Sequence, residues 1–224
     1  MKDVFDPLAD IERALAAQAG WTWFDDYLLY TCGIVESMTA GRGAQIRSNP
    51  TRVRLEPGEI CFADGGVRWF TWRGIVAHPG PAPRHIQIRT PLDAIYQWGA
   101  DVQRQRVEAA AQPRWVAEPP GSAMISNRRI QLANPGRAFS VRWSTLAGID
   151  LVAPDLVGCR FPDHSGAVQQ LQIRTSWAPL VFVTAALQHF PHHPLLRNGT
   201  WLPAGFEDKC HLAGKKCPNV RIPG

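Results

Sequence analysis

The N-terminal part of the chain has apolar residues at every third or fourth position, which is the spacing of an amphipathic helix. Proline is favourable at the first position of a helix, where Pro7 stands, and glycine is favourable just after its end, where Gly20 stands. The apolar positions between them are Leu8, Ile11, Leu15 and Ala19. A second apolar stretch over 21–38 is interrupted by Gly33 and is also interpreted as a helix. The sequence therefore predicts two N-terminal helices, followed by a polar loop over 41–50.

From Val53 onward, short apolar runs are separated by turn signals, a pattern typical of β-strands. Glu56-Pro57-Gly58-Glu59 predicts a turn, and Asp64-Gly65-Gly66 predicts the turn of a β-hairpin between the runs 60–63 and 67–73. Further strands are predicted at 123–132, 138–143, 149–152, 156–161 and 168–173. Short strands at this spacing indicate an antiparallel sandwich or barrel.

The apolar run 179–190 is long enough for a helix, and the prolines that follow would end it. Such a helix would cover one open end of a barrel. Between the strands, residues 78–120 lose the strand pattern and contain a proline-rich loop, a short strand at 86–88 and a helix from Thr90 to about Ala111. We expect an N-terminal helical segment (1–52), a domain (53–196) with an insertion at about 78–120, and a C-terminal tail (197–224). Trp201, Leu202 and Phe206 of this tail could dock on the domain.

The composition narrows the class of protein. The chain has 224 residues, of which 45% are hydrophobic, so it contains enough apolar side chains for a folded core. It has no apolar stretch of about 18 residues, which excludes a membrane-spanning helix, and its first residues lack the apolar centre of a signal peptide. The five cysteines are mostly far apart, which fits reduced thiols better than a disulfide framework. These features predict a cytoplasmic protein.

The charge is unevenly distributed. Lysine and arginine together number 24 against 19 acidic residues, a net charge of +5, and only four of the basic residues are lysines. Residues 1–60 have a net charge of −3, residues 61–150 of +5 and residues 151–224 of +3. A surface that binds a polyanion would therefore lie in the middle or last third of the chain.

Three motifs, in order, resemble the pleckstrin-homology-like (PH-like) and GRAM-like domains found in many bacterial proteins. LEPGEI at 55–60 resembles the L-x-P-G-E motif that precedes their first strands, MISNRRI at 124–130 resembles their ITNRRL strand, and WSTLAGID at 143–150 resembles the strand after it. The resemblance covers about 53–196. It implies an α+β fold, in which a C-terminal helix caps an antiparallel β-barrel or sandwich, with the N-terminal helices, the helical insertion and the tail outside it. Since family members bind phosphoinositides, other acidic lipids or protein surfaces, the resemblance implies a binding module rather than an enzyme.

Six arginines are the candidate ligand-binding residues, because a guanidinium group binds phosphate or carboxylate with two parallel donors. They are Arg68, Arg73, Arg128, Arg129, Arg137 and Arg142. Arg128 and Arg129 are neighbours on a predicted strand, so their side chains would point to opposite faces, and one is expected to pair with Glu56 or Glu59. The others would form a basic rim, as in lipid-binding members of the family, or an ordinary solvated surface.

Zinc-ligand residue types gather near the C-terminus, in His189, His192, His193, Cys210, His211 and Cys217, but their spacing matches no zinc motif. Cys210 and Cys217 could instead form a small disulfide loop under oxidising conditions, and His192-His193 is interpreted as a helix cap. Cys61 and Cys159 lie in apolar runs and are expected to be buried. No nucleophile elbow and no phosphate-binding glycine loop occurs. We therefore expect no catalytic residue, no metal and no cofactor.

These observations predict a non-enzymatic binding module for a protein partner or an acidic lipid headgroup. The absence of a lysine cluster favours a protein over a membrane, and the apolar N-terminal helices could be covered in a homodimer. The alternative is a nucleic-acid-binding protein that uses the basic middle region and exposed tryptophans. A zinc-dependent protein built on the Cys/His residues near the C-terminus is the third hypothesis.

Overall fold

The computed structural model describes residues 7–74, 98–99, 101–103, 105–106, 109, 112–163 and 165–220. The chain divides into two compact units, a large one of Met1–Trp69 with Pro119–Gly224 and a small one of Phe70–Glu118. The loop and strand predicted within 78–89, and the start of the helix predicted from Thr90, lie outside the described residues. The described residues between 98 and 109 are helical, as predicted. Among the described helices, none is both long and apolar enough to cross a membrane.

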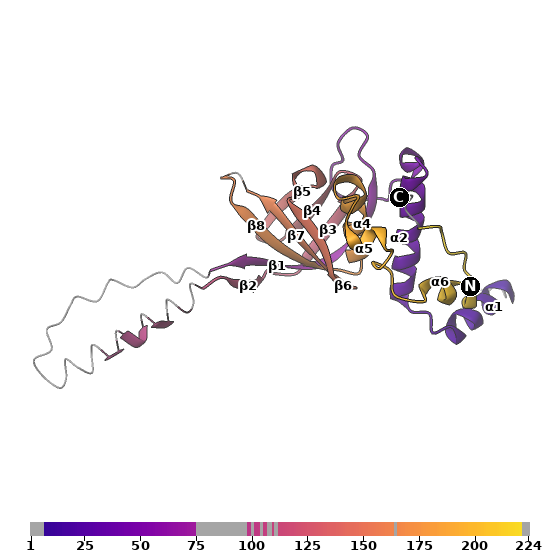
Figure 1. The fold of residues 1–224 in the computed structure, drawn as a ribbon, viewed down its shortest axis with the longest axis horizontal. Coiled ribbons are helices and arrows are strands. Elements are labelled where there is room, and N and C mark those ends of the chain that lie inside the picture. The colour runs from indigo at the N-terminus through magenta and orange to yellow at the C-terminus, as the bar shows by residue number, and fades with distance from the viewer. Residues whose placement is uncertain are drawn as a thin grey trace, which may run out of the picture. The chain divides into compact units, whose positions relative to one another are not determined.

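The large unit begins with the two predicted helices, α1 (Pro7–Gln18) and α2 (Trp23–Thr39) (Figure 1). At the start of α2 the carboxylate of Asp25 accepts a hydrogen bond from the Thr22 backbone N–H at 2.6 Å, which completes a capping box. Gly33 does not interrupt the helix, because the rest of α2 supplies a continuous buried face. The polar loop that follows contains only one short 3₁₀ turn, η1 (Gly43–Gln45).

The first strand, β1 (Cys61–Arg73), is continuous, so the hairpin predicted at Asp64-Gly65-Gly66 was wrong. Neither glycine has a positive φ, which a two-residue hairpin turn would require. Gly65 instead allows the indole of Trp177 to approach the strand, because a Cβ atom at Gly65 would lie 3.1 Å from Trp177 Nε1. Gly65 therefore makes room for a tertiary contact and does not form a turn.

The strand predicted at 123–132 is in fact two strands, because Asn127 and Arg128 form a turn between them. The Ser126 hydroxyl accepts hydrogen bonds from the backbone N–H groups of Arg128 (3.1 Å) and Arg129 (3.0 Å), which reverses the chain without a glycine. The other strands lie within about two residues of their predicted positions. The strands after β1 are β2 (Arg114–Ala117), β3 (Gly121–Ser126), β4 (Arg129–Asn134), β5 (Arg137–Arg142), β6 (Gly148–Ala153), β7 (Leu156–Pro162) and β8 (Val168–Arg174).

The strands form an antiparallel sheet in the order β5-β4-β3-β1-β8-β7-β6, and β2 also pairs with β1, within the small unit. In this order β5 and β6 are the two edges, so the described sheet is open and the predicted barrel is not observed. The connections β3–β4, β4–β5, β6–β7 and β7–β8 join neighbouring strands, whereas the connection from β5 to β6 joins the two edges of the sheet. β1 joins the two halves of the sheet, because it lies between β3 and β8.

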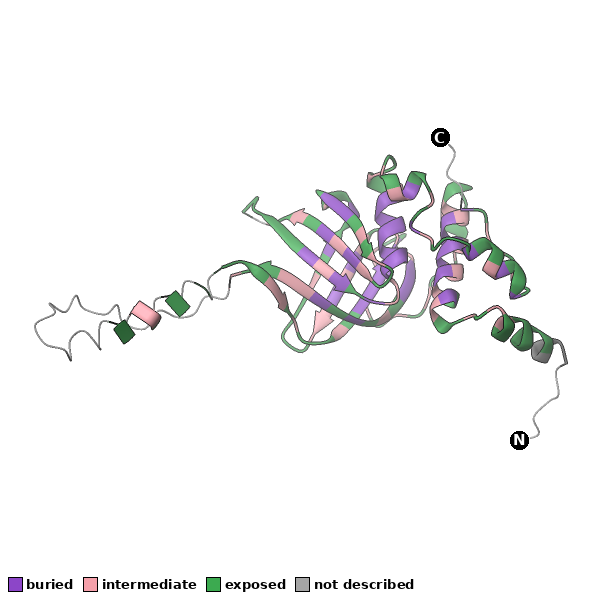
Figure 2. Cartoon of the chain, turned by 60° about the horizontal axis from the view of Figure 1, so that its bottom comes forward, coloured by how far each residue is buried: buried purple, intermediate pink, exposed green. Residues whose placement is uncertain are grey.

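Helix α4 (Ala178–His189) follows the last strand, as predicted, and packs against β6, β7 and α2. All residues from Ala178 to Ala186 are buried, so the helix is apolar all round (Figure 2). The core beneath it is built around Trp69 and Trp143, and the Trp143 Nε1–H donates to the Ser126 carbonyl at 2.9 Å. The predicted α+β class, with an antiparallel sheet and an apolar helix after its last strand, is thus confirmed.

The tail is more ordered than its composition suggested. Helix α5 (Pro194–Arg197) leads into the tail and α6 (Phe206–Leu212) lies within it; neither helix was predicted. Trp201 and Phe206 are buried, which confirms that the tail docks on the rest of the large unit. His193 caps the start of α5, because its Nδ1 accepts a hydrogen bond from the Leu195 backbone N–H at 3.3 Å.

Candidate ligand-binding site

The turn before β1 positions two glutamates. The Glu59 backbone N–H donates to the Glu56 carbonyl at 2.9 Å, and the Glu56 N–H donates to the Glu59 carboxylate at 2.8 Å. Gly58 has a φ of 72°, and a Cβ atom there would lie 3.2 Å from Arg128 Nη2. Glycine is therefore required at this position both for the backbone and for the close approach of a guanidinium group.

Glu59 and Arg129 form a buried ion pair, with side-chain exposures of 0% and 13%. Arg129 Nε and Nη2 donate to the two carboxylate oxygens at 2.9 and 3.1 Å, and the Ser126 hydroxyl donates to the same carboxylate at 2.7 Å. Burial by itself would raise the pKa of Glu59, but the hydrogen bonds from Arg129 and its neighbours hold this pKa below its ordinary value. The predicted pairing across the sheet is confirmed, and the Arg129 guanidinium is used to hold the fold together.

Glu56 binds two further arginines at the surface. Its carboxylate lies 3.5 Å from Arg128 Nη1 and accepts a hydrogen bond from Arg142 Nη2. The side chains of Arg128 and Arg142 remain 42% and 49% exposed, so each keeps N–H donors that face solvent. The register brings Arg142 to this place, because Arg142 pairs with Arg129 across the β4–β5 ladder.

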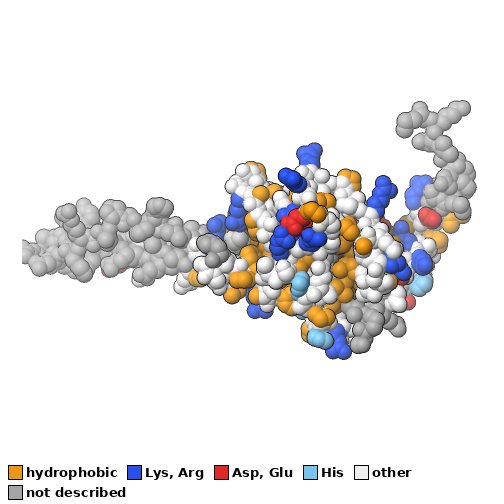
Figure 3. Space-filling model, turned by 90° about the horizontal axis from the view of Figure 1, so that it is seen from above, with side chains coloured by type: hydrophobic (Ala, Val, Ile, Leu, Met, Phe, Trp, Pro, Cys, Tyr) orange, Lys and Arg blue, Asp and Glu red, His pale blue; other side chains and the backbone are white. Residues whose placement is uncertain are grey.

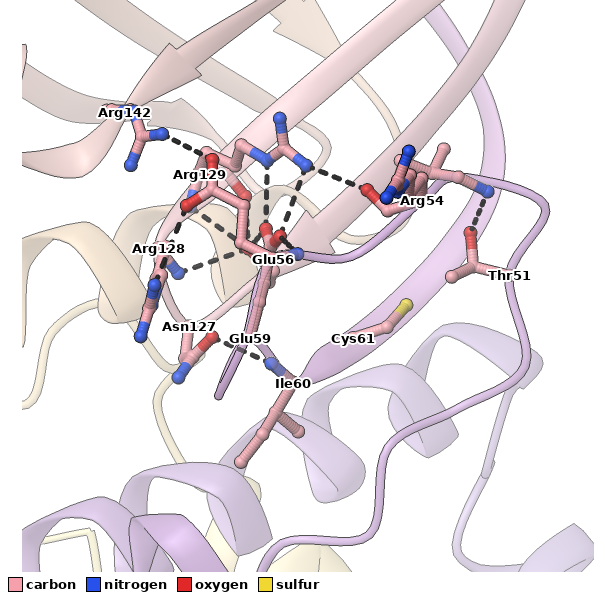
Figure 4. A network of polar contacts seen from close by, with 12 residues as sticks. Thr51, Arg54, Glu56, Glu59, Ile60, Cys61, Asn127, Arg128, Arg129 and Arg142 are labelled. Atoms are coloured by element: carbon pink, nitrogen blue, oxygen red, sulfur yellow. Dashed lines mark hydrogen bonds and ion pairs between the residues drawn. The ribbon is translucent and has the colours of Figure 1, made fainter.

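Arg54 belongs to the same surface, although the sequence pattern did not single it out. It is exposed, and its backbone carbonyl accepts a hydrogen bond from Arg129 Nη2 at 3.1 Å (Figure 4). Arg54 precedes the turn in a stretch without periodicity, so nothing local marks it as a site residue. We call Arg128 and Arg142, which bind Glu56, together with the neighbouring Arg54, the arginine corner.

Two of the motifs quoted for the family resemblance meet at this corner. The Ile60 backbone N–H donates to Asn127 Oδ1 at 2.9 Å, and the Asn127 N–H donates to the Ile60 carbonyl at 3.1 Å. The strand run 124–130 is thereby tied to the turn 56–59 by backbone, amide and ion-pair contacts. The residues of these two motifs therefore have a structural role, since they hold the turn and the strand together. The motifs do not identify a ligand.

The other three candidate arginines lie elsewhere. Arg137 is at the opposite end of the β4–β5 hairpin, where it pairs with Asn134 and lies over the ring of Phe139. Arg68 is exposed on β1, one residue beyond the β1–β3 pair Val67↔Gly121. Arg73 belongs to the small unit, where it forms an ion pair with Glu118 at 2.9 Å. The five candidate arginines of the large unit do not form one rim, and basic side chains are scattered over the face drawn in Figure 3.

Among the described residues, no group of three or more His, Cys, Asp or Glu side chains is arranged to hold a metal ion. Cys61 and Cys159 are buried, as predicted, and burial raises the pKa of their thiols to about 11 and about 12. Such thiols are protonated at neutral pH and are poor nucleophiles. The arginine corner therefore offers the clearest chemistry in this part of the molecule, which is the binding of an anion by forked N–H donors.

Comparison with models of known protein families and with curated proteins finds no match for this chain.

Proposed function

We propose that the protein is a non-enzymatic, cytoplasmic binding module with a PH/GRAM-like fold, and that its arginine corner binds an acidic segment of a protein partner. The order of elements supports the fold. Seven antiparallel strands, β1 and β3 to β8, are followed in the chain by one apolar helix, α4. This is the order that the family resemblance implies, with β2 and the residues before it inserted after the first strand.

The proposed ligand is inferred from the carboxylate of Glu56, which Arg128 and Arg142 both bind. The guanidinium groups of Arg128 and Arg142 share this one carboxylate, and with the nearby Arg54 the arginine corner has a net charge of +2. Arg128 and Arg142 already bind a carboxylate in this geometry, so a second carboxylate from a partner can use the donors that still face solvent. Glu56 holds the two side chains in place before the partner arrives, which reduces the conformational entropy lost on binding.

A protein partner fits this surface better than a membrane. Membrane-binding surfaces combine basic residues with apolar side chains that insert among the lipids. The large exposed apolar side chains of the described residues lie outside the segments that form the arginine corner; they are Ile11, Leu15, Trp23, Trp72, Trp98, Val152, Val168 and Leu212. The arginine corner also contains no lysine, whereas electrostatic membrane anchors are commonly lysine-rich clusters.

The proposal is tested by the binding of a short glutamate-rich peptide, followed by fluorescence anisotropy. We expect the double variant Arg128→Gln/Arg142→Gln to bind the peptide at least about tenfold more weakly, because each charged hydrogen bond contributes about 1.5–3 kcal/mol. The affinity of the natural protein should also fall as salt is raised.

The matched control is Arg68→Gln/Arg137→Gln, which removes the same charge from other parts of the sheet and should leave binding unchanged. Thermal unfolding of both variants checks that each is folded. Equal losses in the two variants would show that only the overall charge matters, and would overturn the proposal. A second result would also overturn the proposal: the peptide does not bind, but vesicles with acidic lipid or duplex DNA do, and this binding depends on Arg128 and Arg142.

A further inference from the structure

Strand β5 is one of the two edges of the described sheet, and β4 is the strand that pairs with it. The register between β4 and β5 is regular over all six residues of β5. The opposite edge, β6, has an irregularity between Leu151 and Ala153, where the register shifts. A bulge makes an edge a poor template for a further strand, whereas a regular edge remains a template. Of these two edges, β5 is therefore the better suited to accept another strand.

The ladder with β4 determines which backbone groups of β5 face outward. The backbone N–H of Trp143, the residue after β5, donates to the Arg128 carbonyl at 3.0 Å, so Trp143 directs its N–H toward the β4 side. The direction of the backbone groups alternates along an antiparallel strand. The backbone groups of Ala138, Ser140 and Arg142 therefore point away from β4.

These outward groups lie at the surface. The side chains of Ala138, Ser140 and Arg142 are all exposed. The Arg142 carbonyl accepts a hydrogen bond from the Thr145 hydroxyl at 2.9 Å, which agrees with its outward direction. The ladder leaves the N–H groups of the three residues, and the carbonyls of Ala138 and Ser140, for a further strand.

The charge of β5 favours an acidic strand over a second copy of this chain. β5 begins with Arg137, ends with Arg142 and contains no acidic residue. If two β5 strands paired antiparallel, Arg142 of each copy would lie near Arg137 of the other, and like charges across strands are destabilising. Arg142 also belongs to the arginine corner and keeps N–H donors that face solvent. An acidic side chain in the incoming strand would meet these donors.

We propose that the acidic segment of the partner binds as an extended strand antiparallel to β5 and so extends the sheet. This rests on the proposed function of the arginine corner, and it specifies the conformation and the sequence pattern of the segment. An acidic residue lies opposite Arg142. The residue three positions later lies opposite Phe139, which is only partly buried, so an apolar side chain is favoured there.

Two N-methylated peptides of one sequence test the proposal. The parent peptide alternates glutamate and valine over six residues, the length of β5. With glutamates opposite Ala138, Ser140 and Arg142, the glutamate N–H groups face β5 and the valine N–H groups face away. N-methylation of the glutamates therefore removes the donors to the outward carbonyls of β5, whereas N-methylation of the valines removes none of them. Fluorescence anisotropy should show that the N-methyl-glutamate peptide binds the natural protein at least about tenfold more weakly than the N-methyl-valine peptide.

A matched pair of variants tests the edge from the side of the protein. Ser140→Pro removes an outward N–H but leaves the β4–β5 ladder and the arginine corner in place, so it should weaken binding of the parent peptide about fivefold or more. Ser140→Val changes the same side chain and keeps the N–H, so it should bind like the natural protein. Thermal unfolding checks that both variants are folded, and the comparison of the two peptides needs no variant.

The outcomes separate this proposal from the proposed function. Equal affinities of the two N-methylated peptides would overturn the added strand, and the proposed function would stand if Arg128→Gln/Arg142→Gln still weakens both. Failure of the parent peptide to bind would overturn both proposals. A difference between the two peptides that the double arginine variant leaves unchanged would support the added strand and overturn the proposed function. A dimer of the natural protein that Ser140→Pro converts into a monomer would assign the edge to a second copy, and would overturn the proposal.

Discussion

Replacing Glu59 with glutamine is expected to lower the free energy of unfolding by about 3 kcal/mol, because a buried ion pair that loses one partner leaves the other charge uncompensated. Arg129 is only 13% exposed, and its Nε and Nη2 both donate to Glu59. Glutamine keeps the size of the side chain but not its charge. Urea unfolding followed by circular dichroism measures the difference.

The matched control for this prediction is Glu56→Gln in the same turn. Glu56 pairs with Arg128 and Arg142, which are about half exposed, and surface ion pairs contribute about 0–1 kcal/mol. Glu56→Gln should therefore cost less than 1 kcal/mol. Equal effects of the two substitutions would show that the buried pair does not stabilise the fold in this way.

The same pair predicts how stability depends on pH. The pKa of Glu59 is lower in the folded protein than its ordinary value of 4.5, so the folded state binds this proton less readily than the unfolded chain does. The stabilisation is complete above the unfolded pKa and is lost as pH falls through the folded pKa. Between pH 7 and pH 3 the natural protein should lose more stability than Glu59→Gln. Parallel pH profiles would contradict this expectation.

Replacing Gly121 with alanine is expected to destabilise the protein by about 3 kcal/mol or more, beyond the usual cost of an extra methyl group in a packed core. A Cβ atom at Gly121 would lie 2.0 Å from the Ala133 carbonyl oxygen and 2.9 Å from the ring of Trp69. Ala133 belongs to the neighbouring strand and Trp69 is fully buried, so neither can move without opening the β3–β4 ladder. Thermal and urea unfolding measure the loss.

The control for Gly121→Ala is Gly66→Ala. Gly66 pairs with Ser122, the position next to the Val67↔Gly121 pair in the β1–β3 ladder. A Cβ atom at Gly66 has no neighbour within 4 Å, so this substitution should change stability by less than about 1 kcal/mol. If the two alanine variants are equally stable, β3 does not approach β4 as closely as the structure shows.

The predictions from sequence succeeded where the signal is local. Helices α1, α2 and α4 were predicted because apolar spacing, proline and glycine act within one or two helical turns. Strands β5 to β8 were predicted because each is bounded by its own turn residues, such as Asn134-Pro135-Gly136. The burial of Cys61 and Cys159 followed from the apolar runs that contain them.

The same local signals failed where distant residues decide the conformation. Gly65 looks like a hairpin turn in the sequence, but it lies in a straight strand because Trp177 packs against it. The turn at Asn127 and Arg128 has no glycine or proline, and it is held by Ser126 and by contacts with Ile60. Helix α6 lies in a stretch with little periodicity, and it is ordered because Phe206 and Cys210 are buried against the rest of the large unit.

The sequence by itself determined the helices at both ends of the domain, most strand positions and the pairing of an arginine at 128–129 with Glu56 or Glu59. Only the tertiary structure decided which arginines come together, because the β4–β5 register places Arg142 at the arginine corner and Arg137 at the other end of the hairpin. Side chains that are distant in the chain become neighbours through strand register and helix packing, and no local pattern of residues records either of these.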